Sequence, residues 1–227
     1  MSVILDKEYT PALSSLDARQ KCMRNTYWLL ALAMIPSVLG AMIGVKYNVP
    51  MPRGIFGFVL FLAVAYGFMF AIEKTKDSAN GIGVLFLFTF FLGLWLTPLL
   101  THTLHMANGG TLIMLAFGGT ASVLAVMATI ATVSKRDFSV MGKFLAAGTV
   151  ILILVSAAAI IFQLAMLQIA LSVVAIGIFS CWILYDVQKV INGGETNYIR
   201  AAMMLFIDVW VIFSNLLSLL GLGGSRD

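Results

Sequence analysis

Two aspartates near the end of the chain have the clearest potential for chemistry. Asp208 follows Arg200 by eight positions within an apolar stretch, which on a helix amounts to roughly 12 Å. A charged aspartate at the centre of a membrane helix costs about 2.5–3.5 kcal/mol, and such residues usually face a bundle interior or a water-filled cavity. Asn215 falls close to the same stripe, which favours an inward face. The alternative is a protonated Asp208 that joins two helices by one hydrogen bond.

Asp186 lies at the end of the preceding apolar stretch, three positions before Lys189. Taken alone, it could be a boundary residue that pairs with Lys189. The two stretches are consecutive and antiparallel, and the loop around 193–195 joins them, so their joined ends must be near each other. This topology brings Asp186 towards Asp208, with Arg200 and Asn215 as the supporting polar residues of the same region.

Two carboxylates that meet in a low-dielectric site cannot both ionise easily, and they share one proton. The protonated pair is a clasp between two helices, whereas the deprotonated pair repels itself or recruits a cation. Calcium is the candidate ion because it is a hard cation that prefers oxygen ligands, and no other cofactor is expected. The pair predicts a pH-sensitive latch on a cation path, with both directions of gating left open.

The composition shows in what surroundings these residues must be positioned. Of the 227 residues, 61% are hydrophobic and 11% are charged, and the mean hydropathy is +1.01. A soluble domain carries about 25% charge, so the composition excludes a soluble domain, a disulfide scaffold and a nucleic-acid-binding domain. The net charge of +4 fits the basic loops of a membrane protein. The expected partner of most of the surface is therefore the lipid bilayer.

The stretches between charged residues predict the number of membrane crossings. A spanning helix needs roughly 20 residues, and the five long uncharged stretches of the chain have room for one, one, two, two and one crossings. The alternation of apolar and polar residues that is typical of the strands of a membrane β-barrel is missing. The sequence thus predicts an all-α integral membrane protein with seven transmembrane helices. Their expected bounds are 26–45, 54–72, 81–101, 110–133, 143–163, 166–190 and 200–221.

Small residues predict where these helices pack most closely. Gly40 and Gly44 form a GxxxG pattern in the first helix, and Thr89, Gly93 and Thr97 share one face of the third. Helix association in lipid depends on close packing of this kind.

The basic residues predict the orientation. Most of them fall on the side of the N-terminus, and the other side has only Lys46, Arg53 and Arg226. The positive-inside rule then places the N-terminus in the cytoplasm, and an odd number of crossings places the C-terminus outside. The expected parts are a cytoplasmic N-terminal tail, a transmembrane domain and a short extracytoplasmic tail, at 1–25, 26–221 and 222–227.

Other chemistries have less support. His102 and His105 have a spacing that could hold a metal, but no acid or cysteine is near them in sequence, which favours a plain loop. An intramembrane aspartyl protease requires Gly-x-Gly-Asp, whereas the chain has Phe-Ile-Asp at 206–208. A retinal protein needs a lysine in the last helix, and 201–225 has none. We therefore do not expect an enzyme.

Sequence motifs surround both aspartates, and helix three carries a further one. They read Tyr185-Asp186-Val187-Gln188, Tyr198-Ile199-Arg200-Ala201, Leu205-Phe206-Ile207-Asp208-Val209 and Phe88-Thr89-Phe90-Phe91-Leu92-Gly93. These motifs resemble those of the Bax inhibitor-1 (TMBIM) family. Segment 193–200 and the Ser225-Arg226-Asp227 ending are similar to its proteobacterial YccA branch.

The resemblance implies a seven-helix inner-membrane protein with the last helix central, and a pH-sensitive calcium leak controlled by the aspartate pair. It carries that role onto Asp186 and Asp208. Some bacterial members latch the pair with an arginine in the second helix, but here the second span has no interior arginine and Arg53 lies at its outer end. YccA-type proteins are also associated with the membrane protease FtsH, as substrate and modulator. That alternative needs no ion conduction, and the tail 1–24 would suit it.

Overall fold

A computed structural model of the chain describes residues 2–134 and 136–223, with side chains from residue 17 to residue 222 apart from Lys135. All regular secondary structure within this range is α-helical. The helices are α1 (Ser2–Lys46), α2 (Gly54–Thr75), α3 (Asn80–Trp95), α4 (Thr97–Leu104), α5 (Gly109–Val133), α6 (Met141–Ile161), α7 (Ala165–Ile191) and α8 (Tyr198–Gly223). Most of the expected C-terminal tail, 224–227, lies outside the described residues.

The helices have the lengths and composition of membrane spans. Six of them are long and apolar enough to cross a bilayer, counting α1 from Asp17, and the bent pair of α3 and α4 forms a seventh candidate if it is one span. Large apolar side chains such as Phe70, Phe117 and Phe144 are exposed on the outside of the bundle, as lipid contact requires. The prediction of an all-α membrane protein is confirmed, with six or seven candidate spans.

The third expected helix, 81–101, is broken at Leu96, where α3 and α4 meet at 42°. Pro98 lacks the N–H that would donate to the carbonyl of Leu94 in a continuous helix. The hydroxyl of Thr97 donates to that carbonyl instead, at 2.6 Å. The bend therefore has a local cause in two adjacent residues, and the uninterrupted helix expected from hydropathy is wrong at this point.

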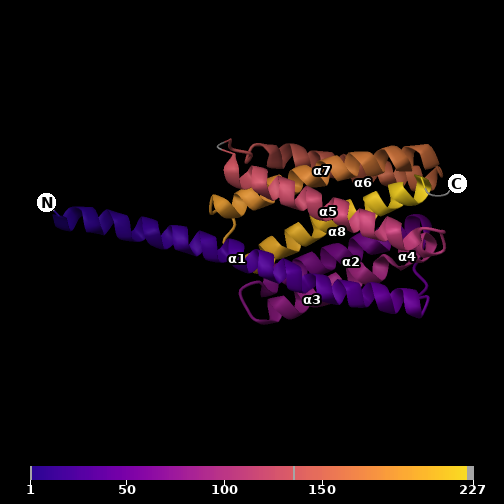
Figure 1. Cartoon of the computed structure of the whole chain (residues 1–227), viewed down its shortest axis with the longest axis horizontal. Helices are drawn as coiled ribbons and strands as arrows, with labels where there is room; N and C mark the ends of the chain where they lie inside the picture. Colours follow the sequence, from indigo (N-terminus) through magenta and orange to yellow (C-terminus); the bar gives the residue numbers. More distant parts are fainter. Residues whose placement is uncertain (1, 135, 224–227) are drawn as a thin grey trace.

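Helix α1 is longer than the first expected span. It begins at Ser2 rather than near residue 26, so the segment expected as an N-terminal tail is helical. Figure 1 shows this part of α1 projecting well beyond the rest of the bundle, on the side opposite the C-terminal end of α8.

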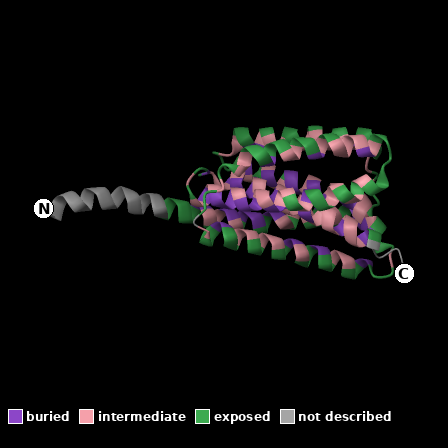
Figure 2. Ribbon diagram, turned by 90° about the horizontal axis from the view of Figure 1, so that it is seen from above, coloured by how far each residue is buried: buried purple, intermediate pink, exposed green. Residues whose placement is uncertain are grey.

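Helix α8 occupies the centre of the bundle. Within the described residues it contacts every other helix except α6, and in Figure 1 it runs between α5 and α7 on one side and α1, α2 and α3 on the other. Its buried side chains include Leu205, Phe206, Ile212 and Leu217. Figure 2 shows buried residues concentrated along the middle of the molecule, with exposed residues on the outer helices.

Helices α1 and α3 pack along glycines, which allow the two backbones to approach. A Cβ on Gly40 would collide with the carbonyl oxygen of Phe90, and a Cβ on Gly93 would collide with that of Ser37. Gly44 lies equally close to Thr97. The sequence prediction that these small residues form a packing face is confirmed.

Candidate functional site

The loop 192–197 between α7 and α8 fixes the relative position of the two aspartates. Gly193 has a φ of +77°, a left-handed conformation that glycine adopts without strain. Asn197 then caps α8, because its Oδ1 accepts hydrogen bonds from the backbone N–H groups of Ile199 at 3.0 Å and Arg200 at 3.2 Å. An N-cap of this kind satisfies donors that have no partner within the helix. The start of α8 is thereby defined.

A polar network ties this loop to the α2–α3 connection. Glu195 is buried, accepts the N–H groups of Thr196 and Asn197 at 3.1 Å each, and forms an ion pair with Arg200 at 3.3 Å. Arg200 also lies 3.5 Å from Glu73 of α2. The side-chain amide of Asn197 donates to the carbonyl of Lys76 at 2.9 Å. Arg200, which we expected near the aspartate pair, is thus engaged by two other acids.

Both aspartates are buried, and both have an oxygen atom without a partner. The exposed fractions of Asp186 and Asp208 are 5% and 4%. Within the described residues, Oδ1 of Asp186 and Oδ2 of Asp208 have no hydrogen-bond partner. Such groups are rare in folded proteins because desolvation is not compensated. Unpartnered oxygens on two neighbouring acids point to a site that receives a proton, a cation or water.

The two side chains line the same cavity, which has a volume of about 580 Å³. Residues of α2, α3, α6, α7 and α8 form its walls. In the described part of the chain no hydrogen bond joins the two carboxylates to each other. They are close enough for the charge of Asp186 to act on Asp208. The charges that act on Asp186 are those of Lys189, Glu195 and Arg200.

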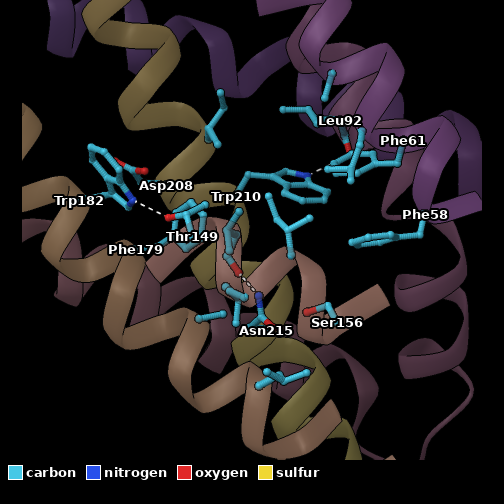
Figure 3. A pocket seen from close by; sticks show the side chains of 18 of the residues that line it. Phe58, Phe61, Leu92, Thr149, Ser156, Phe179, Trp182, Asp208, Trp210 and Asn215 are labelled. Atoms are coloured by element: carbon cyan, nitrogen blue, oxygen red, sulfur yellow. Dashed lines mark hydrogen bonds between the residues drawn. The ribbon is translucent and has the colours of Figure 1, made fainter. Parts of the chain in front are cut away.

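Aromatic side chains form much of the cavity wall, as Figure 3 shows. The indole N–H of Trp182 donates to the hydroxyl of Thr149 on α6 at 2.9 Å. The indole N–H of Trp210 donates to the carbonyl of Leu92 on α3 at 3.0 Å. Phe61 of α2 stacks on Trp210, with ring centroids 5.3 Å apart. Because both indole donors are satisfied by the protein, the rings contribute apolar and π surface to the cavity.

Polar residues occur along most of the cavity. Gln168 lies in the first turn of α7 and Asp186 lies near its end, and both line the wall. Their 18 positions of separation amount to roughly 27 Å of helix, nearly the thickness of the hydrocarbon core of about 30 Å. Asn215 of α8 and Ser156 of α6 lie between these ends. Wall residues of the cavity therefore occur near both ends of α7.

The structure places three of the four expected site residues on this wall, namely Asp186, Asp208 and Asn215. Arg200 is not a wall residue. The sequence reasoning did not identify the aromatic wall, including Trp182 and Trp210. A signal for part of it exists in the sequence, because Trp210 falls in the middle of its apolar stretch rather than at the ends where interfacial tryptophans gather.

The two histidines lie elsewhere, beside a second cavity of about 410 Å³ that Arg53 also lines. Both are exposed, and Nδ1 of His105 lies 2.6 Å from the carbonyl oxygen of Thr101. Among the residues that the structure describes, no group of three or more His, Cys, Asp or Glu side chains could hold a metal. The histidines thus have no acidic or thiolate partner there.

Comparison with known proteins identifies related chains. The sequence model of the family described as "Inhibitor of apoptosis-promoting Bax1" matches residues 19–226. The "Modulator of FtsH protease YccA" of Escherichia coli (strain K12) is 40% identical over 214 residues, which cover 94% of this chain and 95% of that protein. The protein of Escherichia coli O6:H1 with the same identity and coverage is named "Inner membrane protein YccA". "Uncharacterized protein PA2604" of Pseudomonas aeruginosa is 34% identical over 205 residues, 90% of each chain.

Proposed function

The chain belongs to the Bax inhibitor-1 family, and we propose that it is a multi-pass inner-membrane protein that carries a pH-sensitive calcium leak controlled by Asp186 and Asp208. One observation carries this proposal. Two buried carboxylates from consecutive antiparallel helices line one cavity, and each has an oxygen atom without a partner in the described structure.

Protonation of the pair would set the charge of the cavity. When one proton is shared, or when both groups are protonated, the acids have little attraction for a divalent cation. When the pair is fully deprotonated, two negative charges lie in a low-dielectric cavity and repel each other unless a cation neutralises them. Calcium affinity should therefore rise with pH. The two carboxylates provide up to four oxygen ligands, and water in the cavity would complete the six to eight that calcium takes.

The polar residues along the cavity would provide the rest of the path. Gln168, Ser156 and Asn215 line the wall at different depths from the aspartates, and a cation that leaves one hydrated position needs such groups to reach the next. In the proposed topology the chain crosses seven times with its N-terminus in the cytoplasm. The aspartates then lie nearer the cytoplasmic end, because the α7–α8 loop is on the same side as the N-terminus.

Calcium flux into proteoliposomes tests the leak. We expect wild-type protein to give a calcium flux that differs on the two sides of neutral pH. Asp208→Asn should abolish the pH dependence and most of the flux. Asp137→Asn is the matched control, because it makes the same chemical change on an exposed loop residue outside the cavity, and it should behave as wild type. An unchanged, pH-independent flux in Asp208→Asn would remove the channel proposal.

A second candidate function is modulation of a membrane protease of the FtsH type. The observation that favours it is the printed name of the Escherichia coli relative, "Modulator of FtsH protease YccA". Helix α1, which projects beyond the bundle (Figure 1), would give such a protease a segment to engage from the cytoplasm.

Copurification tests the second function. A chain that modulates the protease should copurify with it, and deletion of residues 2–20 should abolish the association. Asp186→Asn and Asp208→Asn should not affect it. If the association requires the aspartates and survives the deletion, α1 is not the contact. If no association is found under conditions where flux is measured, the protease proposal fails by itself.

A further inference from the structure

We propose that the cavity between α2, α3, α6, α7 and α8 binds a lipophilic organic cation, with its charged group beside Asp208 and its apolar body against the aromatic wall. The inference concerns the same aspartates as the proposed leak, but it requires no ion conduction. It assigns the cavity a class of ligand whose size, shape and charge follow from the wall residues.

The first argument is the charge of the wall. Among the described residues that line the cavity there are two acids and no lysine, arginine or histidine. The nearest basic side chains are engaged elsewhere, since Lys189 lies over the ring of Tyr185 at 5.9 Å and Arg200 pairs with Glu195 and Glu73. Lys189 and Arg200 act on Asp186 from outside the cavity, so Asp208 is the carboxylate that has no counter-ion on the described wall. A cationic ligand would supply one.

The second argument is the apolar character of the wall. Phe58, Phe61, Phe179, Trp182 and Trp210 all face the cavity in Figure 3. A hydrated metal ion gains nothing from such surfaces, because its ligands are oxygen atoms. An organic cation gains twice, since aromatic faces attract positive charge and also bury apolar surface.

The third argument is the position of the charge relative to the aromatic rings. In the view of Figure 3, Asp208, Trp182 and Phe179 are drawn on one side of the cavity that they line, and Phe58 and Phe61 on the other. The indole N–H of Trp182 already donates to Thr149, so the ring has no polar group left to direct at a ligand. A cationic group next to Asp208 would thus meet a carboxylate and an aromatic face together.

The fourth argument is size. Binding sites for small organic molecules have volumes of about 300–1,000 Å³ and are mostly apolar, with a few polar groups that fix orientation. The cavity volume of about 580 Å³ falls within that range. Gln168, Ser172 and Asn215 add polar groups away from the aspartates.

Binding of tetraphenylphosphonium to the purified full chain in detergent tests the inference. Tetraphenylborate is the matched control ligand, because it has nearly the same size and shape and the opposite charge. We expect saturable binding of the phosphonium and none of the borate, measured by equilibrium dialysis and by a change in tryptophan fluorescence. Equal binding of the two ions would show a merely hydrophobic association and would overturn the proposal.

Variants of the cavity residues then test whether the phosphonium binds beside Asp208. Asp208→Asn should weaken phosphonium binding at least about tenfold, or about 1.4 kcal/mol, and Asp137→Asn should leave it unchanged. Ser156→Trp fills the cavity and keeps both acids, so it should also abolish binding. Unchanged affinity in either Asp208→Asn or Ser156→Trp would overturn the inference, and the second variant decides if the first does not fold.

The result of the phosphonium-binding test is independent of the result of the calcium-flux test of the proposed leak. Phosphonium binding in a protein that conducts no calcium would support the inference and remove the leak. Calcium flux in a protein that binds no phosphonium would do the reverse. Both results can be obtained from one preparation.

Discussion

The α1–α3 contact and the α2–α6 side of the bundle are built from the same apolar composition, yet they pack differently. Along the first, Gly40 and Gly93 bring backbone against backbone, with no room for a single added carbon atom. Helices α2 and α6 are also in contact, but aromatic and polar side chains beside them line a cavity of about 580 Å³. Small residues in register close an interface in lipid, whereas large and polar ones leave space that a ligand or water can use.

The two regions also differ in whether their polar side chains have hydrogen-bond partners. In the α1–α3 region, the hydroxyl of Thr89 donates to the carbonyl of Phe86 on the same helix, and that of Thr97, at the start of α4, donates to the carbonyl of Leu94 on α3. In the cavity, Asp186 and Asp208 each keep an oxygen without a partner in the described structure. The unpartnered carboxylate oxygens are therefore the feature that marks the cavity as the candidate functional region.

The largest expected effect comes from breaking the close contact. Gly93→Leu places a side chain where the backbone of Ser37 already lies, so we expect little or no folded protein. Gly83→Leu is the control on the same helix, because its position faces open space, and it should fold normally. The yield of monodisperse protein in detergent measures both. A well-folded Gly93→Leu variant would show that the α1–α3 contact is not essential.

The next largest effect on stability is expected in the loop 192–197, which positions the start of α8. Asn197→Ala removes the cap of α8 and the bonds to the α2–α3 connection, so we expect a loss of about 0.5–2 kcal/mol in unfolding free energy. Asn192→Ala changes an exposed asparagine at the other end of the same loop and should have little effect. Thermal unfolding in detergent compares the two, and equal losses would contradict the capping role.

The cavity should tolerate added volume that the close contact does not. Ser156→Leu extends an apolar side chain into the cavity, and we expect the unfolding free energy to change by less than about 1 kcal/mol. A much larger loss of unfolding free energy in Ser156→Leu would mean that α2 and α6 pack more tightly than the structure indicates. The same thermal unfolding assay provides the answer.

The smallest effect on stability is expected from Asp137→Asn, in the α5–α6 loop. A hydrogen bond from the backbone N–H of Ser139 to Oδ1, at 2.9 Å, holds the pKa of Asp137 below its ordinary value. A lowered pKa in the folded state gives a stabilisation that is present above the unfolded-state pKa and is lost as the pH falls through the folded-state pKa. Because the side chain is exposed, acid titration followed by NMR should detect the shift, while unfolding assays of Asp137→Asn should not.

The architecture was predictable because the membrane imposes a length on each apolar stretch. The expected spans 54–72, 110–133 and 166–190 agree closely with α2, α5 and α7. The break at Leu96 was not predicted, since hydropathy carries no information on hydrogen bonding. The continuation of α1 to Ser2 was also missed, because helix formation in a polar segment does not depend on the apolar pattern used to define the spans.

The candidate site was predictable in part. Buried acids are rare enough in membrane spans that Asp186 and Asp208 could be selected from the sequence alone. The antiparallel order of two consecutive helices predicted that the two acids approach each other, whereas the cavity that both line was not predicted. The aromatic wall depends on side chains from five helices, and contacts such as that of Phe61 with Trp210 bring together residues far apart in sequence. No local pattern reports such contacts.

Infrared difference spectroscopy on the purified protein tests most directly whether Asp186 and Asp208 act as one proton-binding unit. A protonated carboxyl group in an apolar cavity has a C=O stretch that is separate from those of amides and carboxylates. We predict such a band at acidic pH that disappears as the pH rises, and that is altered by both Asp186→Asn and Asp208→Asn. A band that responds to only one of the two variants, or that does not titrate, would contradict the account.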